Sequence, residues 1–175
     1  MKAADAVRLA GAAAALGGAL RLAAAFIPAA PGNLEIELLY FIIDVALLFG
    51  LVGLYAADCE RLGWLGLAGF VTAATGLASI VGPDADIGGI NIYAIASAVI
   101  GIGLAIMSVA MLLYGRLPRW IPTLWIASLL AGIAASVLPD KAQLAFLIAG
   151  VFFALGFLGA GVVLFSRPSA WGAES

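Results

Sequence analysis

The chain has 175 residues, of which eight are Lys or Arg, ten are Asp or Glu, and none is His. Hydrophobic residues make up 65 % of the sequence and charged residues only 10 %, against about 25 % charged residues in an ordinary soluble domain. A soluble globule of this composition has too few polar residues to cover its surface. The composition therefore predicts an integral membrane protein and argues against a nucleic-acid-binding protein.

The absence of His and the single cysteine, Cys59, exclude further classes. Without His, the chain lacks the commonest general base and the commonest zinc ligand. One cysteine cannot form an internal disulfide. We expect no cofactor, no metal site and no disulfide-stabilised secreted domain.

Six apolar runs are separated by polar or Pro- and Gly-containing breaks. A hydrocarbon core of about 30 Å needs about 20 apolar residues per helix, and the runs are continuously apolar, unlike the alternating strands of a membrane barrel. The sequence predicts an all-α bundle of six transmembrane helices that forms a single membrane domain over 1–175. The predicted helices span 8–28, 37–57, 63–82, 91–114, 120–138 and 142–165, with a polar turn at 58–61.

The first run also fits a secretory signal, because Lys2 and Arg8 precede it and small residues follow at 23–25. Arg21 interrupts its apolar stretch, however. We therefore expect a retained first membrane helix, with a signal peptide as the alternative.

Orientation follows from the basic residues of the short loops. With a cytoplasmic N-terminus, the inner segments hold six basic residues and the outer segments one, Lys141. This bias predicts that both termini are cytoplasmic. The six inner basic residues are Lys2, Arg8, Arg61, Arg116, Arg119 and Arg167.

Small residues recur every four positions in most of these runs, and such stripes let helices approach closely in lipid. They predict one compact bundle without locating a ligand. The stripes are Ala10, Ala14 and Gly18; Ala68, Thr72 and Gly76; Ser97, Gly101 and Ala105; Ser128, Gly132 and Ser136; and Gly156 and Ala160.

Two ionisable residues, Arg21 and Asp44, fall within hydrocarbon depth. Each lies about 10 Å from the outer end of its predicted helix at 1.5 Å per residue, and the two helices are consecutive. A lone Arg or Asp at the centre of a membrane helix costs about 2.5–3.5 kcal/mol. We therefore predict an intramembrane ion pair between Arg21 and Asp44, which serves either to lock the two helices or to bind a ligand, an ion or a proton.

Further polar residues lie near this predicted pair. Glu37, Tyr40 and Asp44 follow one another at helical spacing, and Thr75 and Ser97 lie at similar depth. Together they predict a polar pocket that opens to the outside. The candidate ligand-binding residues are Arg21, Glu37, Tyr40, Asp44, Thr75 and Ser97.

Two stretches carry a resemblance to known proteins. The segment Glu37 to Asp44 (ELLYFIID), continued by GLVGLY at 50–55, resembles the second helix of several short bacterial polytopic families of unknown function. The turn YGRLPRWI at 114–121 resembles the loop before their fifth helix. This resemblance implies a six-helix protein of the bacterial cytoplasmic (inner) membrane and assigns no catalytic residue.

A looser resemblance is to the substrate-binding subunits of energy-coupling-factor vitamin transporters. Those subunits are similar to this chain in length, in their six helices with cytoplasmic termini, and in a first helix rich in small residues, here Ala10, Ala14 and Gly18. Their first outer loop is long and ordered, whereas this chain offers about eight residues, 29–36.

Three functions remain open. The first is a non-enzymatic accessory or interaction subunit of a larger membrane complex, with membrane-protein partners or further copies of itself. The second is a small-solute or lipid-binding protein, or a transport component, that uses the pocket around Arg21 and Asp44. The third is an intramembrane enzyme with Asp44 or Glu37 as acid or base, although no nucleophile or metal set accompanies them.

Overall fold

The computed structural model describes residues 3–27, 33–81, 86–87 and 90–167 of the chain. Within these residues the structure is helical apart from a two-residue antiparallel ladder that pairs Asp86 with Asn91. The elements are α1 (Ala3–Ala24), α2 (Leu34–Ile80), β1 (Asp86–Ile87), β2 (Ile90–Asn91), α3 (Ile92–Tyr114), α4 (Trp120–Val137), the 3-10 turn η1 (Pro139–Lys141) and α5 (Ala142–Ser166).

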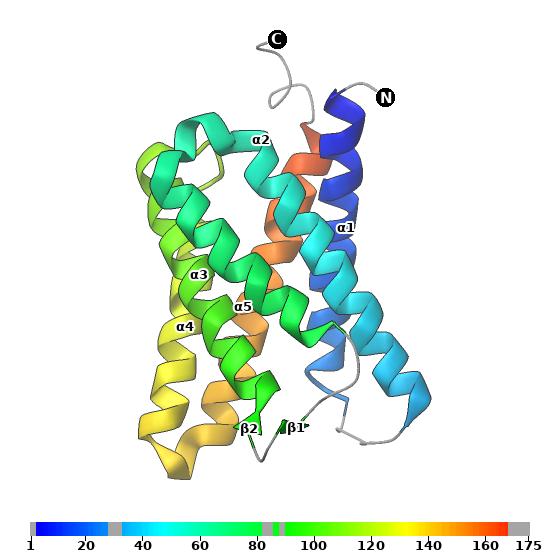
Figure 1. Ribbon diagram of the computed structural model, residues 1–175, viewed down its shortest axis with the longest axis vertical. Coiled ribbons are helices and arrows are strands. Elements are labelled where there is room, and N and C mark those ends of the chain that lie inside the picture. The colour runs from blue at the N-terminus through cyan, green and yellow to red at the C-terminus, as the bar shows by residue number, and fades with distance from the viewer. Residues whose placement is uncertain (1–2, 28–32, 82–85, 88–89, 168–175) are drawn as a thin grey trace.

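The helices form an upright bundle in which the start of α1 and the end of α5 lie at the same end (Figure 1). We call this the upper end, and it also holds the bend of α2 and the α3–α4 connection, 115–119. The lower end holds the end of α1, the start of α2 and η1. In the described part of the chain, five helices are long and apolar enough to cross a membrane.

Helix α2 corrects the predicted break between the second and third apolar runs. Residues 58–61, predicted as a turn, are helical, and the departure from helical geometry comes at Gly63 (φ 56°, ψ −154°). At 47 residues, α2 would measure about 70 Å if straight, more than twice a hydrocarbon core. Figure 1 shows that α2 instead rises to the upper end, turns there and descends beside α3.

A positive φ favours glycine because the Cβ of other residues clashes with the backbone. No atom lies within 4 Å of the place where a Cβ on Gly63 would sit. The requirement for glycine there is therefore conformational and does not come from packing.

The start of α2 carries a side-chain cap that satisfies its free backbone donors. The Asn33 side-chain oxygen accepts hydrogen bonds from the backbone N–H of Glu35 at 3.0 Å and of Ile36 at 3.4 Å. Glu35 and Glu37 lie in the first turn, where negative charge is favoured by the helix dipole.

Small residues bring the helices into backbone contact, as their spacing predicts. A Cβ on Gly18 of α1 would meet the backbone of Ala154 and Leu158 of α5, and a Cβ on Gly11 would meet Gly161 and Phe165. The same kind of contact joins α2 to its neighbours. Gly50 and Gly53 lie against Ala14 and Ala10 of α1, and Gly69 and Gly76 lie against α3.

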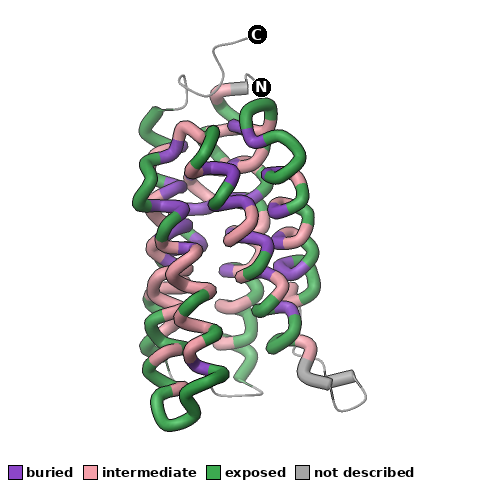
Figure 2. The backbone as a smooth tube through the Cα atoms, turned by 90° about the vertical axis from the view of Figure 1, so that its left-hand side faces the viewer, coloured by how far each residue is buried: buried purple, intermediate pink, exposed green. Residues whose placement is uncertain are grey.

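The two halves of α5 differ in how they pack. All six of its buried residues lie between Ala154 and Leu164, where α5 contacts α1. The first three turns of α5 contain none, and several large apolar side chains there are exposed, including Leu144 and Phe146. Figure 2 shows the same trend, with buried residues concentrated in the upper part of the bundle and exposed residues at the lower end.

The contact at Gly18 generates a stability prediction. Gly18→Leu places a side chain where the backbone of α5 now lies, and we expect it to lower the free energy of unfolding by about 1–3 kcal/mol, as overpacking does in other cores. Gly132→Leu on α4 is the matched control, because no atom lies within 4 Å of its added Cβ. Thermal unfolding in a nonionic detergent measures both, and equal melting temperatures would contradict the close contact.

Candidate ligand pocket and a polar cluster at the upper end

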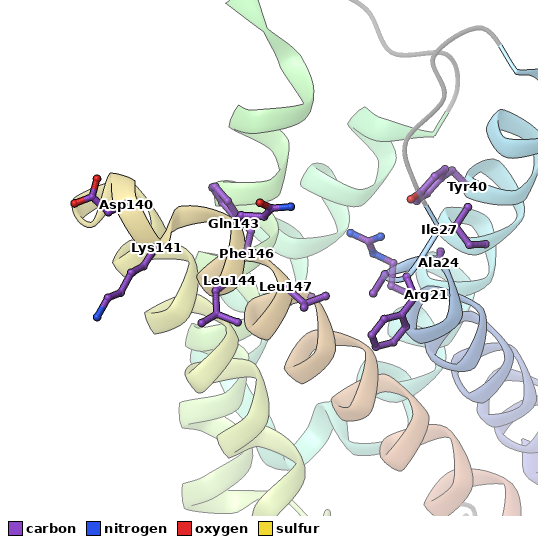
Figure 3. Close-up of a pocket in the computed structure, with 13 residues that line it drawn as sticks. Arg21, Ala24, Ile27, Tyr40, Asp140, Lys141, Gln143, Leu144, Phe146 and Leu147 are labelled. Atoms are coloured by element: carbon purple, nitrogen blue, oxygen red, sulfur yellow. The ribbon is translucent and has the colours of Figure 1, made fainter.

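The lower end of the bundle contains an open pocket of about 700 Å³ between the end of α1, the start of α2 and the start of α5. Its volume falls within the range of about 300–1,000 Å³ that is usual for small-molecule sites. The described residues that line it are Arg21, Ala24, Ala25, Phe26, Ile27, Tyr40, Asp140, Lys141, Gln143, Leu144, Phe146, Leu147 and Gly150 (Figure 3).

The pocket begins where the close contact of α1 with α5 ends. Gly18 lies against Ala154, and the next turn of this antiparallel register places Arg21 opposite Gly150. The residues of α1 in this contact, Gly11, Ala15 and Gly18, are small, and an arginine side chain is too large for such a contact. Beyond Gly18, Arg21 and Gly150 both belong to the pocket wall.

Arg21 is half-buried and has two tyrosine partners. Its Cζ lies 5.7 Å from the centre of the Tyr40 ring, within the range of a cation–π interaction. Its Nη2 donates to the Tyr93 hydroxyl at 3.5 Å, a long hydrogen bond. The side chain thereby links α1 to α2 and α3 at the lower end.

The pairing of Arg21 with Asp44 stays a prediction. The ion pair that the described residues show within 4 Å joins Arg116 to Asp58. Gly17 lies against Leu47 of α2, so Arg21 and Asp44, about one turn further down, lie at similar height. Asp44 is half-buried and follows four residues after Tyr40, the residue of α2 that contacts Arg21.

The other candidate residues divide between the pocket and the outer surface. Tyr40 lines the pocket together with Arg21. Glu37, Thr75 and Ser97 are exposed and, like Asp44, are absent from the described lining. Their part in ligand binding stays a prediction.

Sequence reasoning missed the wall that α5 contributes. The sequence singles out Lys141 only for its bearing on orientation, and it does not single out Asp140, Gln143 or Gly150. The predicted stripe of Gly156 and Ala160 does not identify this wall, because Gly156 lies against Trp125 of α4, whereas Gly18 lies against Ala154 and Leu158.

A second polar cluster, of Asp58 and Arg116, lies at the upper end. The Asp58 side chain is only 4 % exposed, and its Oδ1 lies 3.6 Å from Arg116 Nε. Its Oδ2 accepts a hydrogen bond of 2.9 Å from the Arg116 backbone N–H. Gly115 leaves room for this carboxylate, since its Cβ would lie 3.2 Å from Oδ2. Asp58 therefore fixes the α3–α4 connection to α2.

The hydrophobic periodicity of α2 predicts that Asp58 is buried. Leu47, Leu51 and Leu54 are fully buried along one face of α2, and Asp58 follows four residues after Leu54 on the same face. A carboxylate on a buried stripe needs a partner, which the structure supplies from a loop that is distant in sequence.

Neither cluster resembles a metal centre. Among the described residues, no group of three or more His, Cys, Asp or Glu side chains is placed to hold a metal ion. Comparisons of the chain with family models, with curated proteins and with solved structures give no match.

The Asp58 cluster predicts an asymmetry between its two partners. Asp58→Ala removes both contacts, and we expect a loss of about 1.5–3 kcal/mol in unfolding free energy, the usual value for a hydrogen bond to a charged group. Arg116→Ala keeps the backbone donor and costs less.

Cys59, the neighbouring residue, reports the change through its rate of maleimide labelling, which rises in Asp58→Ala. The exposed Asp140→Ala is the control, and equal labelling rates in all variants would refute the role of Asp58.

Proposed function

We propose that this protein is a multi-pass protein of the bacterial inner membrane with six crossings, two of them made by the halves of α2. The length of α2 and its reversal at Gly63 support this topology. We further propose that the upper end is cytoplasmic. Arg61, Arg116 and Arg119 belong to that end, and the exposed Trp64 and Trp120 suit a membrane interface.

This topology is tested by cysteine labelling in a Cys59→Ser background. We expect a membrane-impermeant maleimide to label Asp140→Cys in intact spheroplasts and Glu60→Cys only in inverted vesicles, because the two residues belong to opposite ends. Labelling of both cysteines from the same side would refute the six crossings. The reverse pattern would refute only the orientation.

We propose further that the protein binds a small solute or a lipid in the lower pocket, as a binding protein or a transport component. The observation that carries this proposal is the arginine in the pocket wall. An intramembrane cation is expensive, and the partners that the described residues give Arg21, Tyr40 and Tyr93, are uncharged. Structural arginines in apolar surroundings are normally paired with carboxylates, so a half-buried guanidinium that contacts two tyrosines in the wall of a pocket favours a binding role.

The alternative of an accessory subunit without a ligand stays a prediction. Stripes of small residues would suit contact with a partner helix. Of the glycines in these stripes, Gly18, Gly76 and Gly156 are already occupied by contacts within the chain, whereas no atom lies within 4 Å of an added Cβ on Gly132. The first three therefore give less support to a partner helix than the sequence alone indicated.

Filling the pocket tests the binding role. Gly150 lines the pocket, and no atom lies within 4 Å of its added Cβ, so the side chain of Gly150→Phe starts from free space and occupies the pocket. Gly132→Phe is the matched control, because Gly132 has equal free space and lies outside the described lining. By native mass spectrometry, we expect a co-purified small molecule on the wild type and on Gly132→Phe, and its loss from Gly150→Phe. A wild type without bound mass, or a Gly150→Phe variant that retains it, would refute the proposal.

A further inference from the structure

Three polar side chains converge on the pocket from opposite walls. Figure 3 shows the Gln143 amide of α5 and the Arg21 guanidinium of α1 pointing toward each other, with the Tyr40 hydroxyl of α2 on the same side as Arg21. Asp140 and Lys141 line the mouth, and their charged ends point away from Arg21 in the same view. Among the described lining residues, the charge that faces the interior of the pocket is therefore that of Arg21.

The partners of Arg21 leave this charge in place. A tyrosine ring and a tyrosine hydroxyl stabilise a cation but do not neutralise it. A guanidinium carries five N–H donors, and the contact with Tyr93 uses one nitrogen at 3.5 Å. The remaining donors suit a planar anion that accepts two parallel hydrogen bonds.

The rest of the pocket wall is apolar. Phe26 and Ile27 contribute from the end of α1, and Leu144, Phe146 and Leu147 from α5. Leu144 and Phe146 are about 60 % exposed, so the pocket is open on the side where the bilayer would lie. Such walls suit a hydrocarbon chain and would leave the polar groups of a sugar or a nucleotide unpaired.

We propose that the ligand of the pocket is an anionic amphiphile with one apolar chain, whose carboxylate or phosphate head binds Arg21. This inference rests on the proposed function, since it names the class of molecule that the same pocket takes. The guanidinium binds the anionic head group, and the Gln143 amide and the Tyr40 hydroxyl donate further hydrogen bonds to it. The chain lies along the apolar residues of α1 and α5.

The test compares probes that share a twelve-carbon chain and differ in the head. Dodecanoate, dodecyl phosphate, dodecanol and dodecylammonium are titrated against the purified protein in a nonionic detergent, with acetate as the head without a chain. We expect the two anions to bind at least about tenfold more tightly than dodecanol, the scale of one charge-assisted hydrogen-bonded contact. Dodecylammonium and acetate bind weakly. The ratio of the two anions distinguishes a carboxylate from a phosphate ligand.

Variants then connect this preference to individual residues. Arg21→Gln should lower the affinity for dodecanoate at least about tenfold and leave that for dodecanol unchanged. Arg21→Lys keeps the charge but loses the planar fork, and gives an intermediate value. Gln143→Leu weakens both anions severalfold. Arg119→Gln, an exposed basic residue of the upper end, is the control that keeps wild-type affinity.

The outcomes separate this inference from the function on which it rests. If dodecanol or dodecylammonium binds as well as dodecanoate, and Gly150→Phe still abolishes binding, the anionic class is wrong and the pocket stands. If dodecanoate binds equally to wild type, Arg21→Gln and Gly150→Phe, it binds elsewhere on the surface and both proposals fail. If no probe binds while Gly150→Phe still loses its co-purified molecule, the inference is overturned and the binding function remains.

Discussion

Backbone contact between α1 and α5 is the constraint on which the shape of the molecule depends. Two apolar helices gain nothing from the hydrophobic effect within lipid, so they associate where small side chains allow dense packing. Gly11 and Gly18 provide that surface on α1, where they lie against the backbone of α5. Arg21 follows about one turn after Gly18, and its much larger side chain lies in the wall of the pocket.

The two ends of the bundle differ for the same kind of reason. At the upper end, Gly63 reverses α2 and Asp58 holds the α3–α4 connection, so a buried carboxylate has both a backbone donor and an arginine. At the lower end, an arginine lies between two tyrosines and an open hollow. Asp58 is thus buried by its contacts at the upper end, whereas Arg21 lies in the wall of an open pocket at the lower end.

The sequence was sufficient for the helical, membrane-type architecture. Continuous apolar runs of this length are compatible only with helices. The bounds predicted for the last three runs agree with α3, α4 and α5 to within a residue or two. It was insufficient at 58–63, because a charged cluster resembles a turn, whereas the backbone reverses only where glycine permits a positive φ. The predicted pocket contained two residues of the actual wall, Arg21 and Tyr40. It lacked α5 because the sequence alone does not say which helix packs against α1.

The pairing of Arg21 with Asp44 illustrates what depth alone cannot reveal. Two residues at equal height on neighbouring helices meet only if both lie on the facing sides, and the contact of Gly17 with Leu47 fixes only their relative height. Height is readable from residue counts. The rotation of one helix against another depends on side-chain packing that involves the whole bundle.

The α5 wall of the pocket is attached to α4. The Ser128 hydroxyl donates a 2.8 Å hydrogen bond to the Ala149 carbonyl, immediately before Gly150, and the Trp125 indole lies against Gly156 with its ring 5.2 Å from that of Phe157. The pocket is therefore bounded by α1 and α2 on one side and, on the other, by an α5 wall that is held to α4 on both sides of Gly150. A displacement of this wall would be shared by α4, although α4 contributes no residue to the described lining.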